Sequence, residues 1–191
     1  MKKALRWPRE IKLPVWDMLR AYLKHYQSET LFSGLEAGRD IITQLSVGLE
    51  SEFSEGIYAL LLKTLSNALI QNTNKGGMLK HAGIVFGSLT SISRRNELQN
   101  TNFLGAFASL LYNFSIACYE KSIDKEELLV DLGDLIRRRL ELDSDPDNRS
   151  LLLQAGANIL YKYHKVVGEK YSFLKSYLQQ DEVSADIKVF Y

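Results

Sequence analysis

Three stretches of this chain repeat one another, and that repetition restricts its possible folds more than any other feature. Each stretch is a leucine-rich or aromatic segment around one asparagine, at Asn67, Asn113 and Asn158. These asparagines are 46 and 45 residues apart, and Arg20 lies 47 residues before the first of them in a further apolar stretch. A period in the middle forties is typical of proteins that stack two or three helices per repeat. The alternative is chance similarity among leucine-rich helices.

Helical periodicity fills most of the rest of the chain, and no alternating apolar run bounded by Asn-Gly or Asp-Gly predicts a strand. The sequence therefore predicts an all-α, armadillo-like α/α superhelical solenoid, in a single domain over residues 1–191. We leave residues 181–191 unassigned, as an extended or docked tail. The expected helices span residues 14–27, 31–48, 55–72, 77–92, 101–120, 125–141, 146–163 and 169–180.

Three local signals place breaks between these helices. Residues 72–77 (Asn-Thr-Asn-Lys-Gly-Gly) tolerate positive φ and predict a loop. Asp124 with Glu127 three residues later predicts a capping box for the following helix. Asp145 before Pro146 predicts a capped helix with proline in its first turn.

The recurring polar position predicts a binding groove. Equivalent helices of a solenoid stack in register, so a residue that recurs once per repeat forms a row along one surface. Asparagine amides offer a donor and an acceptor to a peptide backbone, and lysines one turn away share the same face. Such a groove fits an extended acidic peptide, whose terminal carboxylate could pair with both arms of Arg20. Alternatively, the asparagines bridge neighbouring repeats internally. The predicted groove residues are Arg20, Lys24, Lys63, Asn67, Asn113, Asn158 and Lys162.

Composition argues against several other classes of protein. The net charge of +1 does not favour nucleic acid, although residues 94–95 and 137–139 are short arginine runs. The uncharged stretch 98–119 contains glutamine and asparagines that are costly in hydrocarbon, so we expect a buried helix and no membrane span. A lone cysteine favours a reducing compartment, and we expect a cytoplasmic protein with the nucleus as a second location.

The sequence contains few candidates for catalysis or metal binding. The three histidines, at positions 25, 81 and 164, lack metal-ligand spacing, and no nucleophile elbow, Walker loop or dinucleotide fingerprint occurs. We therefore expect no metal, no cofactor and no enzymatic activity. The rival hypothesis is an all-α enzyme that uses Cys118 or a lipid-facing pocket, but Cys118 lies in an apolar segment where an inert thiol is expected.

Three motifs resemble those of a known family. Residues 6–8 (RWP) and 13–20 (LPVWDMLR) resemble the "WP…(F/L)PxLDxLR" stretch of PUL domains. Residues 102–115 (NFLGAFASLLYNFS) are similar to that family's "ATxxxNYS" helix, and residues 145–156 (DPDNRSLLLQAG) to its "FRxLVALG" helix. The segment that precedes "WP" in the family is absent, so we expect this chain to lack the family's first helices.

The resemblance implies a function. PUL domains are armadillo-like domains of ubiquitin-pathway adaptors, the phospholipase-A2-activating-protein group. They capture the acidic C-terminal tail of a hexameric AAA+ unfoldase, valosin-containing protein, in a basic groove. Arg20 falls on the family's motif arginine. Arg149 lies one residue before the arginine position of the "FRxLVALG" helix, and the resemblance implies it as a further groove residue. The resemblance thus implies a peptide-binding module for ubiquitin-dependent protein turnover, and the alternative within binding is a scaffold for another acidic peptide.

Overall fold

The computed structural model describes residues 7–8, 11–31, 35–95 and 97–180, and these residues form helices and no strand. The expected all-α fold is therefore confirmed, and the tail predicted at 181–191 lies outside the described residues. The elements are α1 (Lys12–Leu23), the 3-10 helix η3 (Tyr26–Leu31), α2 (Leu35–Glu50), α3 (Glu55–Ala68), α4 (Asn72–Lys80), α5 (Ala82–Ser93), α6 (Thr101–Glu120), α7 (Glu126–Leu142), α8 (Pro146–Val167) and α9 (Leu174–Gln180).

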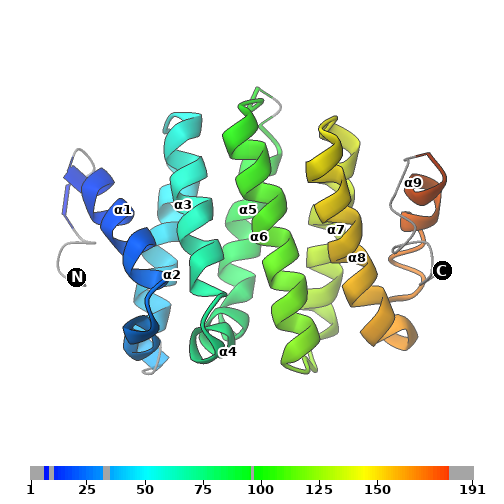
Figure 1. The fold of residues 1–191 in the computed structure, drawn as a ribbon, viewed down its shortest axis with the longest axis horizontal. Coiled ribbons are helices and arrows are strands. Elements are labelled where there is room, and N and C mark those ends of the chain that lie inside the picture. Colours follow the sequence, from blue (N-terminus) through cyan, green and yellow to red (C-terminus); the bar gives the residue numbers. More distant parts are fainter. Residues whose placement is uncertain (1–6, 9–10, 32–34, 96, 181–191) are drawn as a thin grey trace.

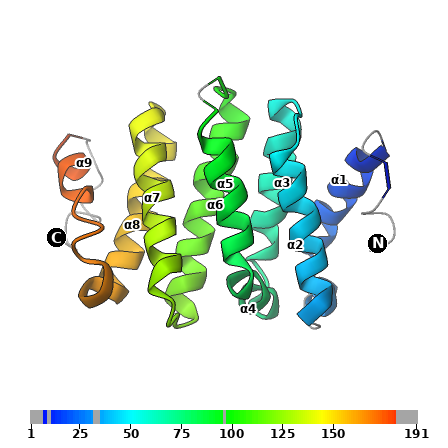
Figure 2. The same ribbon diagram turned by 180° about the vertical axis from the view of Figure 1, so that it is seen from behind.

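The helices form two layers (Figures 1 and 2). Helices α1, α3, α6 and α8 lie side by side in one layer, which we call the first layer and which faces the viewer in Figure 1. Helices α2, α5 and α7 form the second layer, which faces the viewer in Figure 2. The short α4 connects α3 to α5 at one edge of the stack (Figure 1). This is the armadillo-like α/α arrangement that the period predicts.

The period is visible in the hydrogen bonds between successive repeats. In the first layer, Asn67 Nδ2 donates to the carbonyl of Arg20, 47 positions earlier, at 2.8 Å. In the second layer, the Arg138 guanidinium donates to the carbonyl of Ser93, 45 positions earlier, at 3.0 Å. Bonds that recur at a separation of 45–47 positions arise because each unit stacks on the preceding unit in the same register. They show that the spacing read from the sequence reflects structural repetition.

Apolar side chains fill the space between the layers. Phe86 of α5 meets Phe114 of α6 edge to face, with ring centroids 4.8 Å apart, and both rings are buried. Such packing between layers supplies most of the stability of a solenoid, because each helix buries one apolar stripe against its neighbours. The surface of the first layer is therefore left to polar and partly exposed residues.

A short segment covers the C-terminal end of the stack. Tyr171 and Leu174 are fully buried, and Tyr171 Oη donates to the carbonyl of Leu129 at 2.7 Å. Both side chains occupy space that only glycine leaves open. A Cβ at Gly133 would lie 2.8 Å from the Tyr171 ring, and one at Gly156 would lie 2.7 Å from Leu174. The glycines of α7 and α8 thus provide the seats for this closing segment.

Several of the predicted helix boundaries are wrong. The range 14–27 runs past the end of α1 into η3, and the range 169–180 begins before α9 does. Residues 72–77 form the start of α4 and not a loop, and no described residue has positive φ. Tertiary contacts override the weak helix propensity here, since Asn74 is buried and its amide donates to Ser28 Oγ. The expected helix over 77–92 is split at His81 into the end of α4 and α5.

The predicted caps have different outcomes. Asp145 caps α8 as expected, because its carboxylate accepts from the backbone N–H of Asn148 at 3.0 Å. The capping box at Asp124 is wrong: Lys125 occupies the N-cap position of α7 and makes no side-chain cap bond. Helix α7 begins one residue later than that motif requires, so the Asp124 carboxylate is out of register with the first turn.

One arginine of each run caps a helix of the preceding repeat. Arg95, which follows α5, donates to the carbonyl of Glu50 at the end of α2 at 3.2 Å. Arg138 of α7 donates to Ser93 at the end of α5 in the same way. Carbonyls of the last turn lack partners within their own helix and carry partial negative charge, so a cation stabilises them.

Among the described residues, no helix combines the length and apolarity needed to cross a membrane.

Candidate peptide-binding surface

The three asparagines of the repeat link neighbouring helices of the first layer. Asn113 Nδ2 of α6 donates to Ser66 Oγ of α3 at 2.6 Å. Asn158 Nδ2 of α8 donates to Ser115 Oγ of α6 at 3.2 Å. Together with the bond of Asn67 to α1, these contacts use each amide nitrogen between repeats. The alternative that the asparagines bridge neighbouring repeats therefore holds for their amide nitrogens. These bonds also hold in place the helices whose surface a ligand would contact.

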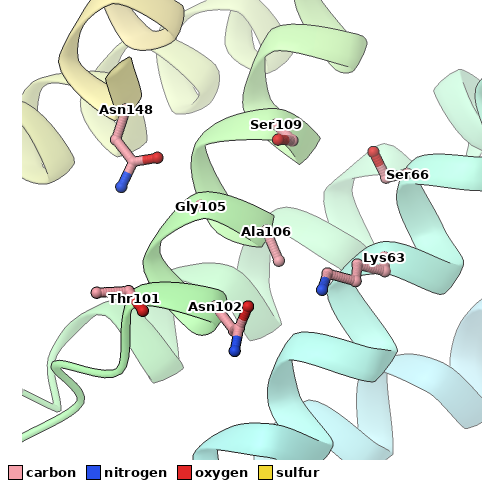
Figure 3. Close-up of a pocket in the computed structure, with 8 residues that line it drawn as sticks. All are labelled: Lys63, Ser66, Thr101, Asn102, Gly105, Ala106, Ser109 and Asn148. Carbon is pink, nitrogen blue, oxygen red and sulfur yellow. The ribbon is translucent and has the colours of Figure 1, made fainter. Parts of the chain in front are cut away.

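A cavity opens on the first layer between α3, α6 and the start of α8 (Figure 3). Its volume is about 240 Å³. The walls are polar, with hydroxyls and amides around a floor of Gly105 and Ala106. The lining residues are Lys63, Ser66, Thr101, Asn102, Gly105, Ala106, Ser109 and Asn148.

Lys63 is the one charged residue among these lining residues. Its side chain is exposed, and in Figure 3 its ammonium points toward the Asn102 side of the cavity. None of the described carboxylates lies within ion-pair distance of it. An ammonium on the rim of a polar cavity, with no carboxylate partner, is suited to an incoming anion.

The first turns of α6 form one side of the cavity. Asn100 caps this helix by accepting from the backbone N–H of Asn102 at 2.9 Å, and Glu55 Oε2 accepts from the N–H of Asn100 at 2.6 Å. These bonds fix the start of α6 beside Lys63. The positive end of the α6 dipole and the lysine therefore lie on the same side of the protein.

Lys162 and Arg149, which were also predicted to line the groove, are engaged within the protein. The Lys162 ammonium donates to the carbonyls of Cys118 and Tyr119 at the end of α6 and lies 5.6 Å from the centroid of the Tyr119 ring. Arg149 donates to the carbonyls of Leu140, at 2.8 Å, and Asp143, at 3.0 Å, at the end of α7. Both side chains act as caps of a preceding helix.

Arg20 lies on α1 and Lys24 is the C-cap residue of that helix, at the other end of the first layer. Arg20 is partly exposed, and its guanidinium meets Asp17 Oδ1 of the same helix at 2.8 Å. The expected pairing of Arg20 with a ligand carboxylate would therefore have to displace or share this contact. Lys24 is exposed, and its carbonyl accepts from Gln71 Nε2 at 3.5 Å.

Sequence reasoning missed five polar residues of the cavity, namely Ser66, Thr101, Asn102, Ser109 and Asn148. One of them carried a readable signal: Ser109 precedes Asn113 by four residues, as Lys63 precedes Asn67. The spacing of four residues before a repeat asparagine, which placed Lys63 in the predicted groove, therefore also places Ser109 there, on the next helix of the layer. Asn148 could not be found this way, because it is buried beneath the first turn of α8 and serves the Asp145 cap.

The hypothesis of catalysis at Cys118 finds little support in the geometry. Cys118 is fully buried, and burial raises the pKa of its thiol from 9.0 to about 12. A thiol that stays protonated at neutral pH is a poor nucleophile. Over the described residues, no group of three histidine, cysteine, aspartate or glutamate side chains is arranged to hold a metal ion.

Two layers of stacked helices with a polar surface cavity define a helical-repeat module for binding other proteins. A comparison with family models identifies the particular family: the PUL domain model matches residues 1–185, and the chain belongs to the PUL domain family. No curated protein matches the chain. PUL is a helical protein-interaction domain and not a known enzyme family, so the chain is a protein-interaction module.

Proposed function

We propose that this PUL domain binds the acidic C-terminal tail of the AAA+ unfoldase valosin-containing protein and thereby serves ubiquitin-dependent protein turnover in the cytoplasm and nucleus. The ligand lies across the first layer, over α1, α3, α6 and α8. The observation that carries the proposal is Lys63, an exposed ammonium on the rim of a polar cavity whose other lining residues are uncharged.

The proposed groove has an uneven distribution of charge. Lys63 lies at the cavity, Lys24 is exposed at the C-terminal end of α1, and Arg20 keeps part of its guanidinium accessible beside Asp17. An extended acidic peptide that crosses α1 and α3 would meet all three cations in succession. Arg20 then shares its guanidinium between Asp17 and the peptide, which an arginine can do because it has five N–H donors.

Calorimetric titration with a peptide of the unfoldase's terminal residues tests this proposal. The matched control is the same peptide with each aspartate and glutamate replaced by its amide. We expect the acidic peptide to bind roughly tenfold or more tightly than the control, since hydrogen bonds to charged groups contribute about 1.5–3 kcal/mol. Binding should weaken between about 0.1 M and 1 M salt, because the screening length falls from about 10 Å to about 3 Å.

A scrambled acidic peptide of the same composition separates the two binding hypotheses. Preference for the natural tail over the scrambled peptide supports the unfoldase as partner. Equal binding of both would favour a scaffold for acidic peptides in general, and equal binding of the amide control would contradict a basic groove.

A further inference from the structure

We infer that the cavity between α3, α6 and α8 is a subsite for a single carboxylate, with Lys63 as its charge partner. This inference rests on the proposed function for its location but makes a separate claim, namely which residues receive an acid group and what kind of group they select. Tail binding requires the exposed cations of the first layer, whereas this inference also requires that one acid group enters the cavity.

The size of the cavity limits what it can hold. Ligand pockets for whole small molecules usually span about 300–1,000 Å³, whereas this cavity has about 240 Å³. At about 30 Å³ per water molecule, it corresponds to a handful of waters. It therefore suits one side chain or one chain terminus, and not a nucleotide or a lipid headgroup with its glycerol.

The lining residues favour a carboxylate over a phosphate group. A phosphate carries about −1.5 to −2 charge and is usually met by clustered arginines. Here the lining provides one lysine, no arginine and several neutral groups. One positive charge matches the single negative charge of a carboxylate, and the Asn102 amide and the hydroxyls of Ser109 and Thr101 can donate to its two oxygens.

The repeat contact at Asn113 helps to position a further donor, the hydroxyl of Ser66. Ser66 Oγ accepts a hydrogen bond from Asn113 Nδ2 at 2.6 Å. Its oxygen is then held by the neighbouring repeat, and its own proton can be donated into the cavity that it lines. Asn113 is thus a positioning residue, although it does not line the cavity.

Gly105 keeps the floor of the cavity open. A Cβ at this position would meet one atom within 4 Å, Asn148 Oδ1 at 3.4 Å. A methyl group would therefore project into the cavity in ordinary van der Waals contact with Asn148, without disturbing the fold. Because glycine is a poor helix former, Gly105→Ala should also raise the stability of α6. This variant fills the site while leaving its charge unchanged.

The test uses the full chain and two small probes in ¹H–¹⁵N NMR titrations, namely acetate and its neutral analogue acetamide, at constant ionic strength. We expect acetate to shift the backbone amide signals of Asn102, Gly105 and Ser109 in a saturable manner, and acetamide to bind at least about tenfold more weakly. Lys63→Gln and Gly105→Ala should each abolish saturation, whereas Lys80→Gln, on an exposed lysine of α4, should not.

Acetate shifts that are absent, unsaturable or unchanged in Lys63→Gln would overturn the carboxylate subsite, whether or not the unfoldase tail binds. Acetate binding at Lys63 without any binding of the tail would instead contradict the proposed function alone.

Two peptides identify the source of the carboxylate. One carries an internal aspartate and an amidated terminus, and the other has no acidic side chain and a free terminus. Competition with acetate by the first assigns a side chain to the cavity, and competition by the second assigns the chain terminus.

Discussion

The junction between α3 and α6 differs from the junction between α6 and α8, although both belong to the same layer and each is linked by a repeat asparagine. The first junction is open and contains the polar cavity beside Lys63. The second is sealed: Tyr163 Oη donates to the carbonyl of Cys118 at 2.8 Å and accepts from the N–H of Ile123 at 2.9 Å. The same repeat therefore gives an open junction with a cavity between one pair of helices and a junction closed by hydrogen bonds between the next pair.

Helix polarity accounts for this difference. Lys162 lies four residues after its repeat asparagine, next to the last turn of α6, where carbonyls attract a cation. Lys63 lies four residues before its asparagine, next to the first turns of α6, where no free carbonyls occur. The lysine at the sealed junction stabilises the fold, and the lysine at the open junction remains available to a ligand.

The largest effect we predict concerns Cys118 at the sealed junction. With its thiol pKa near 12 in place of 9.0, the thiolate fraction at pH 8 falls about a thousandfold. A thiol-reactive dye should therefore modify the folded protein at least about a thousandfold more slowly than the unfolded chain. Rapid modification of the native protein would show that the junction is open and would restore the cysteine nucleophile as a hypothesis.

Tyr163→Phe should have the next largest effect. Removal of the hydroxyl leaves the Ile123 N–H and the Cys118 carbonyl without this partner, which costs about 1–3 kcal/mol of unfolding free energy for a buried group. Tyr112→Phe is the matched control, because the Tyr112 hydroxyl makes no bond to a described residue. Chemical denaturation of both variants measures the difference. Equal stability of the two would mean that Tyr163 does not seal the junction.

Alkaline pH should weaken the sealed junction more than the open one. Burial raises the pKa of both the Cys118 thiol and the Tyr163 hydroxyl, so the folded state retains these protons longer than the unfolded chain. The contribution of the Cys118 thiol is fully present below pH 9 and is lost as the pH rises from about 9 toward 12, at up to about 1.4 kcal/mol per pH unit. Tyr163 acts in the same direction, because burial also raises the pKa of its hydroxyl. Cys118→Ala should reduce this slope in urea titrations, and an unchanged slope in that variant would contradict the assignment to the thiol.

Much of the architecture follows from the repeat. The spacing of Asn67, Asn113 and Asn158 predicted stacked helices in one layer, and it did so because each asparagine bonds to the preceding helix. The failure at residues 72–77 has the opposite cause. Local propensity favours a loop there, but the burial of Asn74 against Ser28 depends on a neighbour 46 positions away.

The candidate site was less predictable than the fold. Sequence spacing placed Lys63 and Lys162 on one face, but it does not show which of them meets a helix end. That depends on the rotation and offset of neighbouring helices, which only the packed structure defines. The same holds for Arg149, whose two carbonyl partners belong to the preceding helix and the loop that follows it.

The most direct test of the account compares Lys63→Met with Lys162→Met in the same two measurements, chemical denaturation and calorimetric titration with the acidic unfoldase tail. We predict opposite patterns. Lys63→Met should weaken tail binding roughly tenfold and change stability by less than about 0.5 kcal/mol, as expected for a surface residue. Lys162→Met should lower stability by about 0.5–1.5 kcal/mol through the loss of its bonds to α6 and change binding less than Lys63→Met does. Unchanged binding in Lys63→Met, with a loss of binding confined to Lys162→Met, would contradict the assignment of the open junction as the ligand site.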